Sequence, residues 1–495
     1  MQNLEQLTSW HSDWRNLRVG VIGLGVSGFS VADTLAELGA NLLVVAPKAE
    51  PDLLDILDVL GVHYLTGADA EAKETAGIPA ALLALDPQLI VTSPGVRPDS
   101  AIIEWATSKQ IPIWVDIELA WRLRDKTQKV ADWICITGTN GKTTTTQLTE
   151  AMLSAGGLRV ASCGNIGTPI LDAIRDPEGF DAIVVELSSF QLHYLGSISP
   201  LASAVLNIAE DHLDWHGGFQ NYTKAKGKVF ENTKLACIYN VADSNTRNLL
   251  ENADVVEGAR AIGFTLGSPG RADVGYVEDI LVDRAFVASY DEAQPVADLA
   301  DIGSIGVVTP HLLANVAAAT ALALSAGVQP TAIRNAIRNF RLDSHRIELV
   351  AESGGISWYD DSKATNPHAT AASLASFDSV VWVVGGLLKG VDIAPLVQKF
   401  ASKLRAAIVI GVERESVLAA LDLHAPGVTV FEVAEAKNDR VMQRVIEFAA
   451  RVAMPGDTVL LAPSSASMDQ FKDYADRGNQ FASAVRAHLK PRGEI

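Results

Sequence analysis

The residues of this chain best suited to chemistry are GTNGKTT at positions 138–144, directly after the apolar run 133–136. A strand that turns through glycines into a helix points several backbone N–H groups at one place, where the helix dipole adds positive potential. Such a turn binds phosphate, with Lys142 reaching the terminal phosphates and the Thr143 hydroxyl offering an oxygen to Mg2+. Ile136 stands where the common P-loop pattern has its first glycine, so an ordinary turn is the alternative. We predict an ATP site formed by Gly138, Thr139, Asn140, Gly141, Lys142, Thr143 and Thr144.

Polar residues also follow the next apolar runs of the sequence. Glu186 lies near the end of the run 183–187, where a carboxylate either binds a metal or caps the following helix. The phosphate-binding turn that precedes it favours the metal. Asn165, within GNIG at 164–167, offers a carboxamide to a polar ligand, and an ordinary turn is again the alternative. Both residues follow strands, and open α/β sheets bind their ligands at the carboxyl ends of strands.

A cluster of histidine and acidic residues, NIAEDHLDWH at 207–216, follows another apolar run. Read alone, it suggests the mixed imidazole and carboxylate ligands of a zinc or manganese hydrolase. It lacks a second ligand set at the spacing of such enzymes, and the phosphate-binding turn precedes it, so the hydrolase is disfavoured. The lysine-rich segment 222–228 is predicted to be helical, and a solvated helix face is its simpler interpretation.

A glycine-rich turn, GLGVSG at 23–28, follows the apolar run 18–22 and precedes a helical pattern. This arrangement is typical of dinucleotide-binding folds, so a nicotinamide enzyme must be considered. An NAD site also needs an acid after the second strand, and Ala46-Pro47-Lys48 stands there instead. We therefore favour another nucleotide diphosphate on this turn, with a purely structural turn as the alternative.

Composition narrows the class of protein. The chain has 495 residues and a formal charge of −19, with scattered acidic residues and no basic cluster of note. That balance argues against nucleic acid or an anionic membrane as the main partner. The three cysteines have no C-x-x-C spacing and are expected to be reduced core thiols. The N-terminus lacks the apolar region of a signal peptide and the stretch 316–328 is too short to span a bilayer, so we predict a cytoplasmic protein.

The elements that position these residues alternate strand-like and helical patterns in three blocks, as α/β proteins do. We predict a Rossmann-like domain at 1–128, a central P-loop domain at 129–341 and a second Rossmann-like domain at 342–495. Residues 265–305 are acidic and are expected to form an irregular peripheral insertion. The predicted strands of the third block are 356–359, 380–384, 407–410, 428–431 and 458–461.

The order of these motifs resembles the Mur ligase family, and the resemblance covers most of the chain. The motifs in family order are GTNGKTT at 138–144, GNIGTP at 164–169, ELSSFQL at 186–192, NIAEDHLDWH at 207–216, Tyr222 with Lys226, His311 with Asn315, His345-Arg346, DDSKATNP at 360–367, GGLLKGVD at 385–392 and PSSASMDQFKDYADRG at 463–478. The joint match is very specific, although no single motif is decisive. Elements within the last three motifs are similar to those of the family member that adds D-glutamate.

The resemblance implies an ATP-dependent amide ligase of peptidoglycan precursor synthesis. ATP would convert the carboxylate of UDP-MurNAc-L-Ala into an acyl phosphate, and the amine of D-Glu would displace the phosphate. Mg2+, expected at two sites, and lysines would neutralise the anions brought together. The implied partners are these small molecules, with no nucleic acid and no membrane span, and we expect a monomer.

The family's functional residues carry over onto matching positions of this sequence. The implied catalytic residues are Lys142, Glu186, His212 and Lys226, and the implied metal ligands are Thr143, Glu186, His212 and Lys226, the last as a carbamate. ATP would also contact Asn315, Arg346 and Asp361. The UDP-sugar would contact Ser27, Gly95, Asn165, Ser188 and Gln191. D-Glu would be held by Lys363, Thr365, Lys389, Ser467 and Tyr474.

Three positions depart from the family pattern. Ala46-Pro47-Lys48 replaces an acid and a basic residue near the uracil, Leu312 replaces the first Asn of H-N-x-x-N, and Tyr474 stands where Phe is common.

Two rival interpretations are folylpolyglutamate synthase, which shares the ATP chemistry, and a noncatalytic ATP-binding regulator. The glycine-rich first domain and the SKATN sequence disfavour the first rival, and the four implied catalytic residues disfavour the second.

Overall fold

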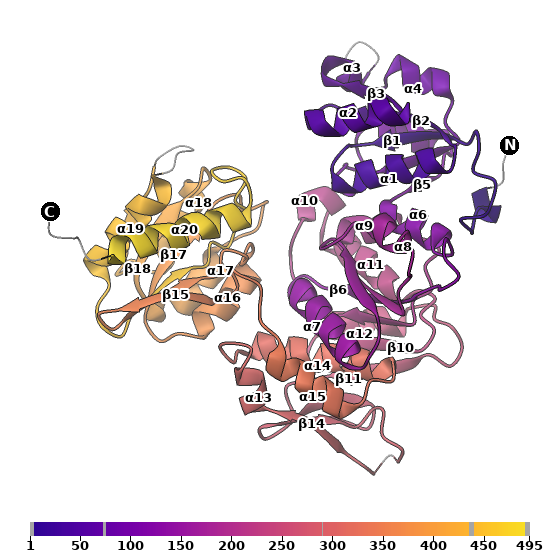
Figure 1. Cartoon of the computed structure of the whole chain (residues 1–495). Coiled ribbons are helices and arrows are strands. Elements are labelled where there is room, and N and C mark those ends of the chain that lie inside the picture. Colours follow the sequence, from indigo (N-terminus) through magenta and orange to yellow (C-terminus); the bar gives the residue numbers. More distant parts are fainter. Residues whose placement is uncertain (1–3, 73–75, 290, 435–439, 491–495) are drawn as a thin grey trace. The chain divides into compact units, whose positions relative to one another are not determined.

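The computed structural model describes residues 4–72, 76–289, 291–434 and 440–490. Within these ranges the chain forms three sheets, of five, nine and six strands, each accompanied by helices (Figure 1). By its contacts the chain divides into two compact units: unit 1 is Met1–Ile208, Gln220–Ile302 and Ala314–Phe340, and unit 2 is Ala209–Phe219, Gly303–Leu313 and Arg341–Ile495. The first two sheets lie in unit 1 and the third lies in unit 2. The predicted α/β class with three sheets is confirmed, whereas the domain boundaries at 128 and 341 stay predictions.

The first sheet is wholly parallel, in the order β3-β2-β1-β4-β5. Its central strand β1 (Arg18–Ile22) is buried from Val19 onward, as expected for a strand covered on both faces. The other strands are β2 (Asn41–Ala46), β3 (His63–Thr66), β4 (Leu89–Thr92) and β5 (Ile113–Trp114). The helices of this part are η1 (Leu4–Gln6), α1 (Val26–Glu37), α2 (Pro51–Leu60), α3 (Gly67–Glu71), α4 (Ala80–Leu85), α5 (Ala101–Ser108) and α6 (Asp116–Leu123).

The second sheet has the order β14-β13-β12-β11-β10-β9-β6-β8-β7, and it is parallel from β7 to β12. Strand β8 reads AIVVE and is buried throughout, which is typical of the centre of a parallel sheet. The strands are β6 (Asp132–Thr137), β7 (Val160–Gly164), β8 (Ala182–Glu186), β9 (Ala202–Val205), β10 (Ala236–Asn240), β11 (Arg260–Phe264), β12 (Asp273–Val277), β13 (Ile280–Asp283) and β14 (Gln294–Asp298). The helices are α7 (Lys142–Ala155), α8 (Ile170–Ile174), α9 (Ser189–Tyr194), α11 (Phe219–Gly227), η3 (Lys228–Phe230), α12 (Ser244–Glu251), α13 (Leu299–Gly303), α14 (Pro310–Ser325) and α15 (Pro330–Asn339).

The expectation of an irregular insertion at 265–305 is wrong. Strands β12, β13 and β14 extend the second sheet as an antiparallel meander. Each is only four or five residues long, and the turn between β12 and β13 contains Glu278 at φ 55°. Acidic residues in turns and at strand ends hid the short apolar cores of these strands, such as Leu281 and Val282.

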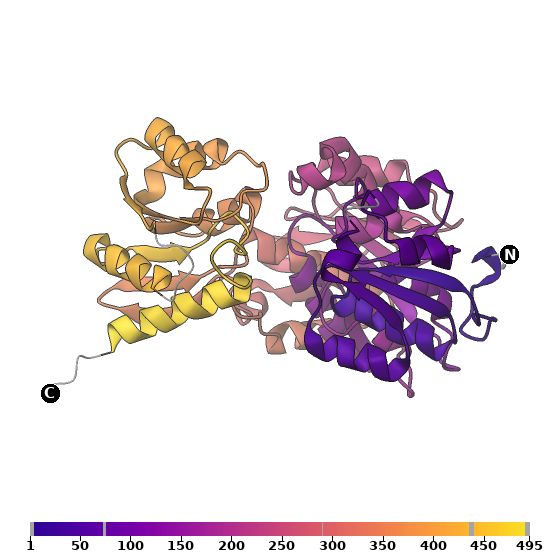
Figure 2. The same cartoon turned by 90° about the horizontal axis from the view of Figure 1, so that it is seen from above.

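The third sheet has the order β15-β16-β20-β17-β18-β19, with only β15 antiparallel to its neighbour. Alternate residues of β17 enter two separate cores, because Trp382 packs on one face and Val383 on the other. Helices therefore cover both faces, as Figures 1 and 2 show. The strands are β15 (Glu348–Ser353), β16 (Ile356–Asp360), β17 (Val380–Gly385), β18 (Leu404–Ile410), β19 (Thr429–Glu432) and β20 (Thr458–Leu461). The helices of unit 2 are α10 (Leu213–His216), α16 (Pro367–Ala375), α17 (Ala394–Phe400), η4 (Ala401–Lys403), α18 (Arg414–His424), α19 (Val441–Val452) and α20 (Tyr474–Leu489).

Helix α6 joins the first sheet to the second within unit 1. Glu118, almost fully buried, accepts hydrogen bonds from the backbone N–H groups of Gly196 and Ser197, at 3.1 Å each. It also pairs with Arg122 at 2.9 Å, one turn along the helix. A second connection runs from α1 to α8, where the Ser30 hydroxyl donates to Asp172 at 2.7 Å. These bonds fix the glycine-rich turn relative to the second sheet.

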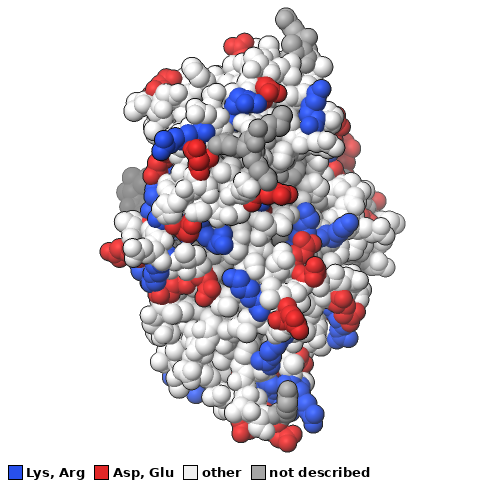
Figure 3. Space-filling view, turned by 90° about the vertical axis from the view of Figure 1, so that its right-hand side faces the viewer, with Lys and Arg blue, Asp and Glu red and all other residues white. Residues whose placement is uncertain are grey.

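The surface mixes both signs of charge. On the face shown in Figure 3, basic and acidic side chains are interspersed, and neither sign forms a continuous patch. Cys135, Cys163 and Cys237 are buried and unpaired, as predicted. In the part of the chain that the structure describes, no helix has the length and apolar character needed to cross a bilayer.

Candidate active site

The predicted phosphate-binding loop connects β6 to α7, as the sequence indicated. Gly141 is the N-cap residue of α7 and has φ 83°, a left-handed conformation that glycine adopts without strain. A Cβ atom there would lie 2.3 Å from Oδ1 of Asn315, so the loop packs directly against that side chain. Asn315 on α14, predicted to contact ATP, is therefore brought to the loop.

Asn207 holds this loop in shape. Its side-chain oxygen accepts from the N–H of Asn140 at 2.9 Å, and its Nδ2 donates to the Asn140 carbonyl at 3.0 Å. Its own carbonyl accepts from the N–H of Thr139 at 3.0 Å. No role for Asn207 was predicted from the sequence, although its place after an apolar run was the available signal.

Lys142 is held close to the loop that it was predicted to serve. Its ammonium donates to the carbonyl oxygens of Gly138 at 2.9 Å and Thr139 at 3.0 Å. This geometry keeps a positive charge beside the turn, at the amino end of a 14-residue helix. Both features favour an anion at that place.

Glu186 ends β8 and is 1% exposed. Its Oε1 accepts from Nδ2 of Asn165 at 2.9 Å, and the Asn165 N–H donates to the Glu186 carbonyl at the same distance. Its Oε2 is buried and has no hydrogen-bond partner among the residues that the structure describes. A buried carboxylate oxygen without a donor fits a cation, so this observation supports a divalent metal here.

The alternative role of Glu186, as a helix cap, belongs to Ser188 instead. Ser188 is the N-cap residue of α9, and it forms a capping box with Gln191. Both residues were predicted to contact the UDP-sugar. Their side chains are engaged in this cap, and that predicted contact is untested.

Lys226 is buried, which the simpler interpretation of a solvated helix face did not expect. It lies on α11 with 1% exposure, and its ammonium donates to the Gly138 carbonyl at 2.9 Å and to the Thr137 hydroxyl at 3.2 Å. Tyr222, one turn earlier, packs its ring 5.0 Å from the same nitrogen. Ile136 pairs with Glu186 in the sheet, so Lys226 contacts the strand end next to the predicted metal ligand.

Asp116, at the start of α6, is a further buried group of this region that was not predicted from the sequence. The side chains of Ser27 and Gln191, two predicted UDP-sugar contacts, lie close enough to its carboxyl to favour the charged form. Burial raises the pKa of its carboxyl above the usual value. Its signal in the sequence, an acid after a two-residue strand, is too weak to single it out. Gly95, another predicted contact, has open space where a Cβ would lie.

His212 belongs by its contacts to unit 2, whereas Thr143, Glu186 and Lys226 belong to unit 1. His212 has φ 53°, and its Nε2 lies 3.6 Å from Oδ2 of Asp211. The same carboxylate lies 3.6 Å from the ammonium of Lys389, a predicted D-Glu contact. A shared metal site containing all four residues stays a prediction.

The other predicted D-Glu residues cluster in unit 2. The ammonium of Lys363 lies 4.9 Å from the ring of Tyr474. The hydroxyl of Ser362, the residue before Lys363, donates to the Tyr474 carbonyl at 2.7 Å. The N–H of Thr365 donates to the Lys363 carbonyl at 2.9 Å. A bridge between Leu387 and Ala466 sets the segment of Lys389 beside that of Ser467.

Asp361 is the buried acid of the predicted ATP-binding pair in unit 2. Burial raises its pKa to about 6, although Arg346 and a hydrogen bond from the Ser373 hydroxyl favour the charged form. Its Oδ1 accepts from the N–H of Ile347 at 3.3 Å. Asp361 and Arg346 are thus close to one another, as their common prediction requires.

Comparison with known proteins assigns the segments that carry these residues to one family. The Mur ligase middle domain matches residues 136–323, and the Mur ligase, glutamate ligase domain, matches residues 345–465. A UDP-N-acetylmuramoylalanine–D-glutamate ligase of Leifsonia xyli subsp. xyli is 54% identical over 500 residues, which cover 99% of this chain and 96% of that protein. Ligases of the same name from Thermobifida fusca and Streptomyces avermitilis are 47% and 45% identical, each over 96% of this chain and 99% of the relative.

Solved structures share the fold at low identity. The MurF ligase of Thermotoga maritima, solved in complex with ADP, has a TM-score of 0.55 at 16% identity and covers 99% of this chain and 100% of its own. The pseudomurein peptide ligase type C of Methanothermus fervidus has a TM-score of 0.58 at 16% identity, over 95% of this chain and 99% of its own.

Proposed function

This chain belongs to the Mur ligase family, and from that premise we propose that it is a D-glutamate-adding ligase, which joins D-glutamate to UDP-N-acetylmuramoyl-L-alanine with ATP. The geometry that supports this function best is one edge of the second sheet. There the phosphate-binding loop follows β6, and the neighbouring strand ends in Glu186, whose Oε2 is buried without a donor. An anion and a cation are both suited to this edge, as a ligase that uses ATP and Mg2+ requires.

The proposed reaction activates a carboxylate before an amine attacks it. A carboxylate oxygen of UDP-MurNAc-L-Ala attacks the γ-phosphorus of ATP, the bond to the β–γ bridging oxygen breaks, and ADP leaves. The amine of D-Glu then attacks the acyl-phosphate carbon and loses a proton, and inorganic phosphate departs. The product is UDP-MurNAc-L-Ala-D-Glu, an intermediate of peptidoglycan precursor synthesis. Because the reaction uses ATP and a nucleotide-linked precursor, we propose the cytoplasm as its compartment.

In this proposal the loop binds the nucleotide. The backbone N–H groups of residues 138–144 and the ammonium of Lys142 hold the β- and γ-phosphates, and Asn315 contributes from α14. Arg346 and Asp361 of unit 2 complete the ATP contacts. Thr143, Glu186 and His212 would hold Mg2+, which supplies charge neutralisation between phosphate and carboxylate. The orphan oxygen of Glu186 supports this assignment.

Lys226 is proposed to work as a carbamate. Its neutral amine attacks CO2, an N–C bond forms and a proton leaves, so that a cation becomes an anion. Burial beside the strand end of Glu186 supports the idea, because an ammonium there would repel Mg2+. As an ammonium it donates to both the Gly138 carbonyl and the Thr137 hydroxyl, whereas a carbamate keeps a single N–H and could donate to only one of them.

Two separate sets of residues are proposed to bind the two substrates other than ATP. Ser27, Gly95, Asn165, Ser188 and Gln191 are proposed to contact the UDP-sugar. The closeness of both Ser27 and Gln191 to the Asp116 carboxyl supports their common location. Lys363, Thr365, Lys389, Ser467 and Tyr474 are proposed to hold the two carboxylates of D-Glu. Charged hydrogen bonds to Lys389 would bind one carboxylate.

Release of phosphate from ATP tests the function. It should require UDP-MurNAc-L-Ala and D-Glu together, with Mg2+, and should stop when either substrate is omitted. Phosphate release that continues without the UDP-sugar would contradict a ligase and would indicate an ATPase with another role.

A further inference from the structure

The turn that carries Arg346 has two strained residues. His345 has φ 69° and Ile347 has φ 47°, so both neighbours of Arg346 adopt left-handed conformations. Residues other than glycine rarely adopt this backbone region, and a β-branched residue such as isoleucine is especially disfavoured there. Such strain persists only where the surroundings hold it, and it gathers at ligand clamps.

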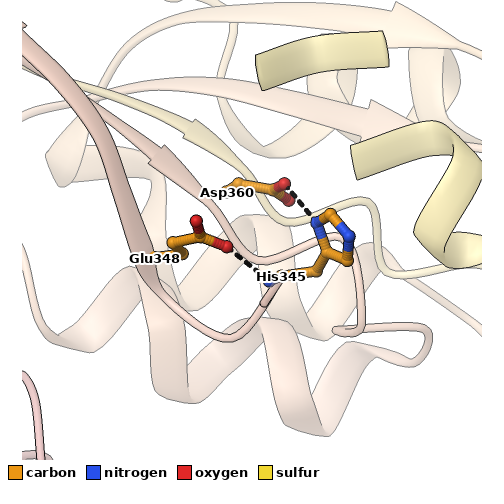
Figure 4. Close-up of side chains that lie close together, drawn as sticks. All are labelled: His345, Glu348 and Asp360. Atoms are coloured by element: carbon orange, nitrogen blue, oxygen red, sulfur yellow. Dashed lines mark hydrogen bonds and ion pairs between the residues drawn. The ribbon is translucent and has the colours of Figure 1, made fainter. Parts of the chain in front are cut away.

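Three acids hold this turn. The N–H of His345 donates to Oε2 of Glu348 at 2.9 Å, and its ring Nδ1 donates to Oδ2 of Asp360 at 2.6 Å (Figure 4). Beyond Arg346, the N–H of Ile347 donates to Asp361. Glu348 and Asp360 are register partners across β15 and β16, so the imidazole of His345 also offsets two carboxylates that face each other.

These residues are spaced like a metal site, but their atoms are already engaged. The ligand atoms of His345, Glu348 and Asp360 lie within 4.8 Å of one another. Nδ1 of His345 contacts one oxygen of Asp360, and the other oxygen accepts from the N–H of Ser362 at 2.9 Å. Nδ1 of His345 and both oxygens of Asp360 therefore already have partners, and these contacts fix the chain at this turn.

Helix α20 covers the pair at a single glycine. A Cβ atom on Gly478 would lie 2.2 Å from Nδ1 of His345 and 2.6 Å from Oδ2 of Asp360. Nothing larger than hydrogen fits between helix and pair without a shift. The next residue back, Arg477, is fully buried and donates to the Ser362 hydroxyl at 2.9 Å and to the Ser362 carbonyl at 2.8 Å.

We infer that the His345–Asp360 pair, seated against Gly478, is a positioning device for Arg346. It holds the strained turn in place before the nucleotide binds. The Arg346 side chain therefore loses little conformational freedom when its guanidinium binds an anion. The inference rests on the proposed function in one respect, that the anion is ATP. Neither His345 nor Asp360 needs to touch a substrate.

Gly478→Ala tests this most directly. The added methyl group should displace the pair and raise KM for ATP by about 10-fold or more, because a charged hydrogen bond loses its geometry, while kcat and KM for D-Glu change far less. Gly427→Ala is the matched control, since nothing lies within 4 Å of its Cβ position and its φ is not in the left-handed region. The control should leave all three constants unchanged.

Asp360→Asn leaves the number of heavy atoms unchanged and serves if Gly478→Ala fails to fold. It should also raise KM for ATP selectively, because a neutral amide holds the imidazole less tightly. An unchanged KM for ATP in the folded variants, or an equal rise in the KM values of all substrates, would overturn the positioning role. The wild-type protein separates the two claims: if it does not consume ATP, the proposed function fails, whereas normal ATP use with unaffected variants refutes only this inference.

Discussion

The ammonium of Lys389 lies 3.6 Å from the carboxylate of Asp211, and this ion pair joins the GGLLKGVD segment to the NIAEDHLDWH segment within unit 2. Lys389 has φ 55°, so a strained backbone presents its side chain. Lys389 already faces a carboxylate here, which is the chemistry proposed for D-Glu. Asp211 is followed by His212, a proposed Mg2+ ligand, so the ion pair links the proposed D-Glu contact Lys389 to the residue before that ligand.

Lys389→Ala should raise KM for D-Glu by about 10²-fold, because a substrate carboxylate loses its charged partner. KM for ATP should change little. Lys399→Ala, which removes an exposed lysine of α17 in the same unit, is the control for net charge. Steady-state kinetics with D-Glu as the varied substrate measure the effect, and an unchanged KM would remove Lys389 from the D-Glu site.

Lys142→Ala should lower turnover by about 10²-fold or more, because the charge beside the terminal phosphates is lost. Phosphate release under saturating substrates measures it. Lys109→Ala, at an exposed position after α5, is the matched control. Near-normal turnover in Lys142→Ala would contradict the assignment of residues 138–144 as the ATP site.

Lys226→Ala should lose activity, and formate or acetate should restore part of it by replacing the missing anion near the metal. Lys226→Arg should stay inactive, because a permanent cation cannot become a carbamate. Activity assays with and without the small carboxylate distinguish the roles. If arginine works as well as lysine, the residue is a cationic phosphate clamp and the carbamate proposal is wrong.

The raised pKa of Asp361 should make the free energy of unfolding depend on pH. Burial raises its pKa from 3.8 to about 6, so the folded protein binds this proton more tightly than the unfolded chain. The wild type should therefore lose stability relative to Asp361→Asn as pH rises through this interval, by about 3 kcal/mol in total. Urea unfolding of both proteins at about pH 4 and about pH 7 measures the difference. Equal pH dependence of the two proteins would contradict a raised pKa.

The positions and ends of several strands were predictable from sequence, because parallel strands are continuous apolar runs followed by polar residues. The order of the strands within each sheet was not predicted. Strands Arg18–Ile22 and Thr458–Leu461 lie where the pattern indicates. Glu186 and Asn165 adjoin at a sheet edge for the same reason. The resemblance to a family then supplied roles that spacing alone could not.

Residues whose importance depends on a distant partner could not be found this way. Asp116 matters because Ser27 and Gln191 converge on it, and Gly478 matters because His345 lies beneath it. Neither relation leaves a local pattern. The burial of Lys226 likewise follows from packing of α11 against β6, which the helix periodicity does not reveal.

The central claim is that the acceptor is D-Glu, and a panel of acceptors at fixed UDP-MurNAc-L-Ala and ATP tests it most directly. D-Glu, L-Glu, D-Asp and meso-diaminopimelate are compared by phosphate release and by the mass of the product. L-Glu should be slower than D-Glu by about 10²-fold or more, because holding both carboxylates moves its amine off the acyl phosphate. D-Asp, one methylene shorter, should bridge the two contacts badly. Preference for any of the other three amino acids over D-Glu would contradict the account and assign the chain to another member of the family.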